Sequence, residues 1–175
     1  MVLTSILLCY CPMTKTVAGA SVPAGTLEAR VKSGCLFNFV RFTTWPIDVL
    51  PFGKPIGICA MGAADVERML ENTYRGREIE NHPLIFRQIS DATELSGCHL
   101  LFLSGPESKE MRAVRKSPRM ALLLIVGDDA TYSKFGTLLD FFIEDDRVAF
   151  NANGEAISRS RVRLSSKLLN LAKFR

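Results

Sequence analysis

The first two thirds of the chain alternate short apolar runs with amphipathic segments. Leu27, Val31 and Cys35 recur at a spacing of four, which predicts a helix over residues 26–44 that ends before Pro46. Short apolar runs bounded by turn residues are typical of buried parallel strands. The predicted strands are 55–61, 78–89, 99–104 and 121–126, and the predicted helices between them are 63–72 and 106–116.

The pattern changes in the last third of the chain. Two predicted strands, 137–143 and 147–151, are joined by the polar turn 144–146, which indicates an antiparallel hairpin. A short helix over 154–160 and a closing helix over 165–174 complete the chain. Alternating strands and helices followed by a hairpin predict an α/β fold, a three-layer sandwich with a mixed, mostly parallel sheet and a Rossmann-like appearance.

The N-terminus is typical of an export signal. An apolar run at residues 2–11 precedes small residues at 17–20, a pattern that signal peptidase cleaves. We therefore expect a signal peptide over 1–20 and a single exported domain over 21–175. Basic residues do not precede the apolar run, so a buried first strand or helix is the alternative.

Composition and charge exclude two classes of protein. With 47% hydrophobic and 23% charged residues, the 175-residue chain has the composition of a globular domain and not of a disordered one. Basic residues exceed acidic ones only by 22 to 18. The densest basic stretch, 112–119, contains no aromatic residue, and we expect no nucleic-acid partner.

Candidate chemistry lies at the ends of the predicted strands. Gly62, Ser104 and Gly127 each follow a strand, at the edge where parallel sheets hold small ligands. Two kinds of protein would use a site at these strand ends: a small-ligand sensor and an enzyme. We find no nucleotide-binding glycine motif and no paired nucleophile and base, so we expect neither a catalytic residue nor a cofactor.

Three cysteines follow the expected signal peptide. Cys59 lies in one predicted strand and Cys98 just before another, and in neighbouring parallel strands these positions come within bridging distance. We expect a disulfide between them and a free thiol at Cys35, with two buried free thiols as the alternative. Together with His99, the pair lacks the ligand spacing of structural zinc, so no metal site is expected.

The first predicted helix carries more large apolar side chains than one buried stripe needs. At about 100° per residue, Phe37 points away from the face that carries Cys35. We expect Phe37, Arg41 and Trp45 to form an interface with a partner or with a second copy of the chain. Packing against the core or beneath the closing helix is the alternative.

Four segments, taken in order, resemble the YfiR family. They are FNFVRFTTWP at 37–46, ICAMG at 58–62, GCHLLFLS at 97–104, and the stretch that begins with LLLIVGD at 122–128 and ends with LLNLAKF at 168–174. The resemblance covers residues 26–174.

This resemblance implies a non-catalytic periplasmic protein. Such a protein binds and restrains the periplasmic part of an inner-membrane diguanylate cyclase, in cyclic-di-GMP signalling and biofilm control, or serves a sensor kinase. The family also has a disulfide where Cys59 and Cys98 stand. A second pair, known in the family's repressor, would fall within 128–141, where this chain has no cysteine, so redox control of that kind is not expected. Residues 63–64 and 151–154 differ from the family's pattern, so the resemblance allows a partner other than that of the family's repressor.

Overall fold

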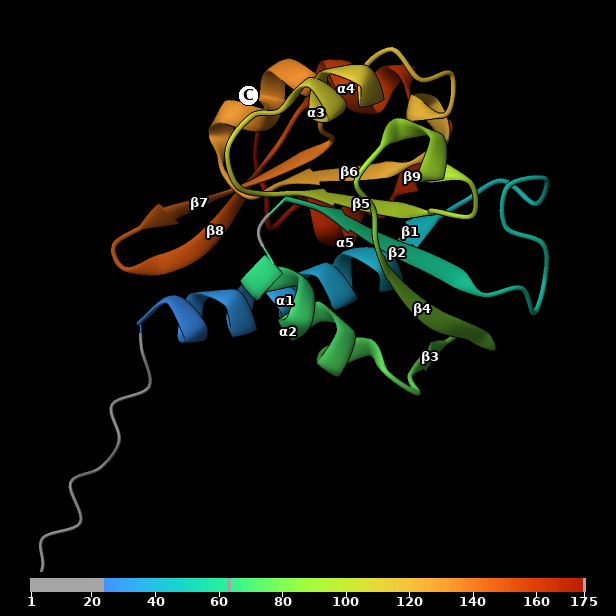
Figure 1. Ribbon diagram of the computed structural model, residues 1–175, viewed down its shortest axis with the longest axis horizontal. Coiled ribbons are helices and arrows are strands. Elements are labelled where there is room, and N and C mark those ends of the chain that lie inside the picture. Colours follow the sequence, from blue (N-terminus) through green and yellow to red (C-terminus); the bar gives the residue numbers. More distant parts are fainter. Residues whose placement is uncertain (1–23, 63, 175) are drawn as a thin grey trace, which may run out of the picture.

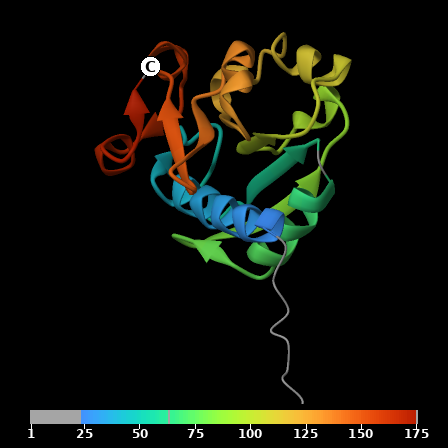
Figure 2. The same cartoon turned by 90° about the vertical axis from the view of Figure 1, so that its left-hand side faces the viewer.

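The computed structural model describes residues 24–62 and 64–174, and the expected signal peptide lies outside them. Within these residues an eight-stranded sheet separates two layers of helices (Figures 1 and 2). The helices are α1 (Ala24–Arg41), α2 (Ala64–Tyr74), α3 (Lys109–Val114), α4 (Gly154–Arg159) and α5 (Ser166–Leu169), with the 3-10 turns η1 (Ala92–Leu95), η2 (Met120–Leu122) and η3 (Ala130–Phe135).

The sheet is mixed and mostly parallel. Its strands are β2 (Ile56–Met61), β3 (Glu78–Ile79), β4 (His82–Gln88), β5 (Leu100–Leu103), β6 (Leu124–Gly127), β7 (Leu139–Glu144), β8 (Arg147–Ala152) and β10 (Lys173–Phe174). The order is β10-β8-β7-β6-β5-β2-β4-β3, in which the five strands from β7 to β4 run parallel and the other three, β3, β8 and β10, are reversed. A separate ladder pairs β1 (Thr43–Thr44) with β9 (Arg163–Leu164). The predicted fold class is therefore confirmed.

The centre of the sheet is made by the apolar runs of the sequence. Every residue of β2, β5 and β6 is buried, because α1 and α2 cover one face of the sheet and α3 and α4 cover the other (Figure 1). Aromatic rings join α1 to the hairpin of β7 and β8: Phe39 lies 5.5 Å from Phe141 and 4.7 Å from Phe150, measured between ring centroids. The core thus fixes α1 along the hairpin.

A buried lysine, paired with two partly exposed carboxylates, also fixes α1 to the sheet. Lys32 is 6% exposed, and its ammonium contacts Asp128, which follows β6, at 2.7 Å and Glu28 at 2.6 Å. Burial by itself lowers the pKa of Lys32, but hydrogen bonds to the two carboxylates outweigh it, so this pKa is raised. The same ammonium lies 5.7 Å from the ring centre of Phe141.

Three predicted elements differ in the structure. The strand predicted over 78–89 is two antiparallel strands, β3 and β4, because the chain turns at Glu80 and Asn81, both with positive φ angles. The first helix ends at Arg41 because Thr43 and Thr44 pair with β9. The predicted closing helix is wrong in its second half: α5 has one turn, capped as expected by Ser165, and residues 173–174 then pair with β8. No helix within 24–62 and 64–174 has the length and apolar character to cross a bilayer.

Candidate functional site

The predicted ligand edge is largely filled by the protein itself. Gly62 has a φ of 132°, and a Cβ atom there would lie 1.6 Å from the carbonyl oxygen of Ser104. A Cβ atom on Gly127 would lie 2.4 Å from Oδ1 of Asp140 and 2.5 Å from the Cβ of Tyr132. Strand pairing brings the three predicted residues to one edge, but there they meet neighbouring protein atoms at close range.

A small hollow remains beside this edge. Its volume is about 270 Å³, and Gly62, Gln88 and Met111 are among the residues that line it. Farther along the edge, the buried carboxylate of Asp140 accepts hydrogen bonds from the hydroxyl groups of Ser133 and Thr137. Within residues 24–62 and 64–174, no group of three His, Cys, Asp or Glu side chains is placed to hold a metal ion.

The predicted disulfide between Cys59 and Cys98 is present, with the two Cα atoms 5.8 Å apart. Cys35 is free and half-buried, and burial raises the pKa of its thiol. The guanidinium of Arg87 lies 3.7 Å from the sulfur of Cys59 and 3.3 Å from that of Cys98. It also donates to the carbonyl oxygen of Ser96, which holds the cation against the bridge.

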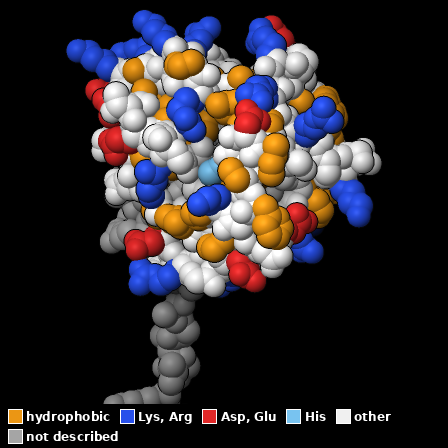
Figure 3. All heavy atoms as spheres, turned by 90° about the vertical axis from the view of Figure 1, so that its right-hand side faces the viewer, with side chains coloured by type: hydrophobic (Ala, Val, Ile, Leu, Met, Phe, Trp, Pro, Cys, Tyr) orange, Lys and Arg blue, Asp and Glu red, His pale blue; other side chains and the backbone are white. Residues whose placement is uncertain are grey.

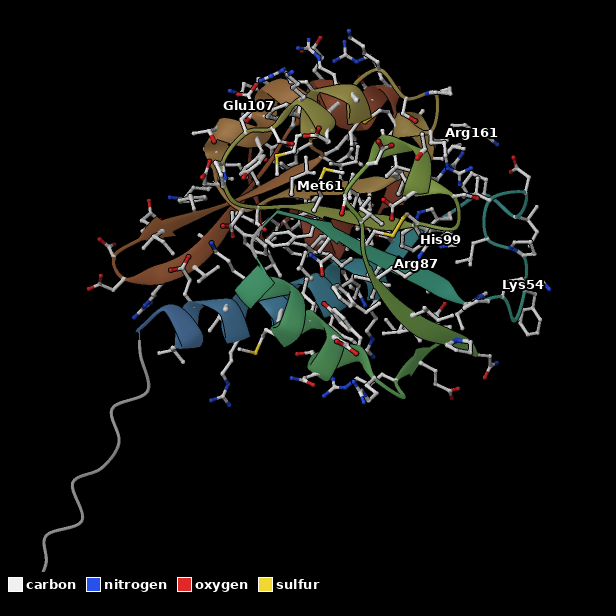
Figure 4. All side chains as sticks on the ribbon, in the orientation of Figure 1. Lys54, Met61, Arg87, His99, Glu107 and Arg161 are labelled. Atoms are coloured by element: carbon white, nitrogen blue, oxygen red, sulfur yellow. A yellow bond between two sulfur atoms is a disulfide. The ribbon has the colours of Figure 1, made fainter. Side chains whose placement is uncertain are left out.

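His99 lies next to the bridge and is part of the core, at the same end of the sheet as Arg87 in Figure 4. The Gly57 N–H donates to Nδ1 at 2.9 Å, so Nε2 carries the proton and donates to the carbonyl of Val49 at 3.2 Å. Burial lowers the pKa of His99. Trp45 packs edge-on against the imidazole at 5.9 Å and is 7% exposed, so the fold buries a side chain that we expected at an interface.

The other two predicted interface residues lie one turn apart on α1, and they differ in exposure. Phe37 is half-buried and stacks on Tyr74 of α2 at 6.3 Å, with the guanidinium of Arg77 at 5.3 Å from its ring centre. Arg41 is exposed. The contact that Phe37 needs therefore comes from α2, and the three residues do not form an open surface.

An apolar groove lies at the opposite end of α1, where the β7–β8 hairpin extends beyond the sheet (Figure 1). Its volume is about 510 Å³. Leu27 and Val31 line it from α1, and Ile143 and Val148 line it from the hairpin. The first three are 59%, 42% and 51% exposed, which makes this the main cluster of open apolar side chains near α1.

Sequence reasoning missed this groove. Leu27 and Val31 belong to the apolar helical stripe that we assigned to the core. Periodicity shows which face of a helix is apolar, but not that this face extends beyond the sheet on which the helix packs. A usable signal was the apolar Ile143 directly before the acidic turn, where a solvated hairpin tip is normally polar. Glu28, Asp146 and Arg147 form its charged rim.

Comparison with known proteins gives a family match and distant similarities to solved structures. A family model described as YfiR/HmsC-like matches residues 29–173. No curated protein matches the chain. Among solved structures, a conserved domain protein from Vibrio cholerae O1 biovar eltor str. N16961 is similar at 8% identity, with a TM-score of 0.49. The match covers 83% of this chain and 59% of the other, so the chain spans less than two thirds of that protein.

Proposed function

The chain belongs to the YfiR/HmsC-like family, and from this membership we propose that it is a non-catalytic periplasmic regulator. It binds and restrains the periplasmic domain of an inner-membrane diguanylate cyclase, which lowers cyclic-di-GMP and limits biofilm formation. The family match over residues 29–173 is the observation that carries this proposal. The disulfide supports it, because such bridges persist in oxidising compartments such as the periplasm.

The groove between α1 and the hairpin is the surface that we assign to the cyclase. A contiguous set of exposed apolar side chains marks an interaction site more often than scattered ones do. Leu27, Val31 and Ile143 form such a set, and the charged groups at the rim give it the apolar centre and polar border of a protein interface.

Binding of the purified periplasmic domain of the host's cyclase tests both statements. Ile143→Asp places a charge in the groove, and we expect its affinity to fall by about tenfold or more. Ile85→Asp is the matched control, because Ile85 is 46% exposed and lies on β4, near the opposite edge of the sheet from the β7–β8 hairpin. We expect Ile85→Asp to bind as the unmodified protein does.

The possible outcomes distinguish an error in the assigned binding surface from an error in the proposed function. Equal binding by both variants would show that the groove is not the contact, while leaving the cyclase as the partner. Failure of the unmodified protein to bind the cyclase domain would overturn the proposed function. Binding to the periplasmic domain of a sensor kinase instead would assign the chain to that class of partner. Deleting the gene should raise cyclic-di-GMP in the host.

A further inference from the structure

The helical layer on the other side of the sheet is basic. Residues 105–120 contain five basic and two acidic side chains, in a chain whose net charge is only +4. In Figure 3 Lys and Arg side chains crowd the upper rim of the molecule, where this layer lies. We call the following exposed side chains from α3, the turn after it, η3 and α4 the basic layer: Lys109, Arg112, Arg115, Lys116, Lys134 and Arg159.

Acidic neighbours neutralise only part of this layer. Glu107 contacts both Arg112, at 2.9 Å, and Lys134, at 2.5 Å, so one carboxylate serves two cations. These contacts hold the pKa of Glu107 below its usual value, Lys134 having the larger effect. Arg115 and Lys116 form no ion pair with any residue that the structure describes. The layer therefore keeps a positive charge that the fold does not use.

Three cations of the basic layer line a polar hollow of about 600 Å³. Arg115, Lys134 and Arg159 approach it from three different elements, and Asn153 adds a polar side chain. Glu155 also lines the hollow but is paired with Arg159 at 2.8 Å. Cations that converge from three elements on one polar hollow suit a phosphate group, which accepts hydrogen bonds from several donors at once.

The absence of apolar anchors in this layer indicates the kind of partner. Among the described residues, the exposed large apolar side chains all lie outside 105–136 and 153–161. Protein interfaces normally centre on buried apolar or aromatic anchors. Adhesion to an anionic bilayer needs only cations near its surface, each of which strengthens binding by roughly fivefold.

We propose that the basic layer docks the protein on an anionic phospholipid membrane, with lipid phosphates seated among Arg115, Lys134 and Arg159. The proposal does not depend on the identity of the protein partner. The groove lies against α1, on the other side of the sheet, so membrane and partner can be bound together.

Co-sedimentation with vesicles tests this docking. At about 50 mM salt the protein should bind vesicles of equal parts phosphatidylglycerol and phosphatidylcholine, and should leave them at about 500 mM salt, where charges are screened. Arg115→Glu combined with Lys116→Glu should weaken binding by about tenfold or more. The matched control is Arg30→Glu combined with Lys54→Glu, since both of these side chains are exposed and lie outside the basic layer.

Several results would overturn the proposal. One is equal loss of binding in the two double variants, which would reflect net charge alone. Another is equal binding to pure phosphatidylcholine vesicles, which would mean that phosphate charge is not recognised. Capture of an acidic protein without any binding to anionic vesicles would assign the layer to a protein partner instead. Melting curves of both double variants establish that each is folded. Failure of the unmodified protein to bind anionic vesicles, while it still binds the cyclase domain, would overturn the membrane docking and leave the proposed function intact.

Discussion

Replacing Gly62 tests whether the carboxyl ends of the parallel strands are packed against the protein itself or hold a ligand. An alanine there must adopt a φ of 132°, which costs roughly 1–3 kcal/mol for a residue with a side chain. Its Cβ atom would also lie 1.6 Å from the carbonyl oxygen of Ser104, so the ends of β2 and β5 must move apart. That movement strains the hydrogen bond from Ser104 N–H to the Met61 carbonyl, now 3.0 Å, and adds about 1 kcal/mol.

We therefore expect Gly62→Ala to lower the free energy of unfolding by about 2–4 kcal/mol. Gly34→Ala is the matched control: this helical glycine has no neighbour within 4 Å, and the change should raise stability by about 0.5–1 kcal/mol. Urea titration followed by the fluorescence of Trp45, the single tryptophan, measures both. A Gly62→Ala variant as stable as the unmodified protein would refute this reasoning and reopen the edge as a ligand site.

Two further predictions concern the bridge and the histidine beside it. Reducing the Cys59–Cys98 bridge, which spans 39 residues, should lower the free energy of unfolding by about 4 kcal/mol and the melting temperature by about 8–16 °C. The Cys35→Ala variant, which keeps the bridge, should melt at the temperature of the unmodified protein. A fall of less than about 2 °C on reduction would contradict this prediction. Burial lowers the pKa of His99 below its ordinary value of 6.5, so the unfolded chain binds the proton more readily than the folded one. The contribution of His99 to the free energy of unfolding should therefore be fully present above pH 6.5 and should fall as the pH drops below that value. His99→Asn, whose Oδ1 can still accept from Gly57, should flatten this slope in urea titrations and His82→Asn should not; equal slopes in all three proteins would exclude His99 as the cause.

The sequence predicts the elements whose burial is uniform and misplaces those that depend on distant partners. The strands at the centre of the sheet are apolar throughout, so their pattern alone identifies them. Residues 173–174 form a strand only because β8 offers its free edge, and no local pattern encodes that pairing. For the same reason Phe37 was expected at an interface: its contact, Tyr74, lies two residues beyond the predicted end of α2. The disulfide could be predicted because Cys59 lies within one strand and Cys98 just before another, and the structure makes these two strands neighbours.

The disulfide has one more consequence, for how the protein withstands proteases. Cys59 and Cys98 close a covalent ring that contains α2, β3, β4 and η1, and thus one complete edge of the sheet. An accessible point of this ring is the turn at Glu80 and Asn81, which is exposed and has positive φ angles at both residues. A cut there leaves two polypeptides that stay joined through the bridge and through the core strands. A nicked molecule would therefore run as an intact chain until it is reduced, and in a compartment that contains proteases it would persist as a folded two-chain species.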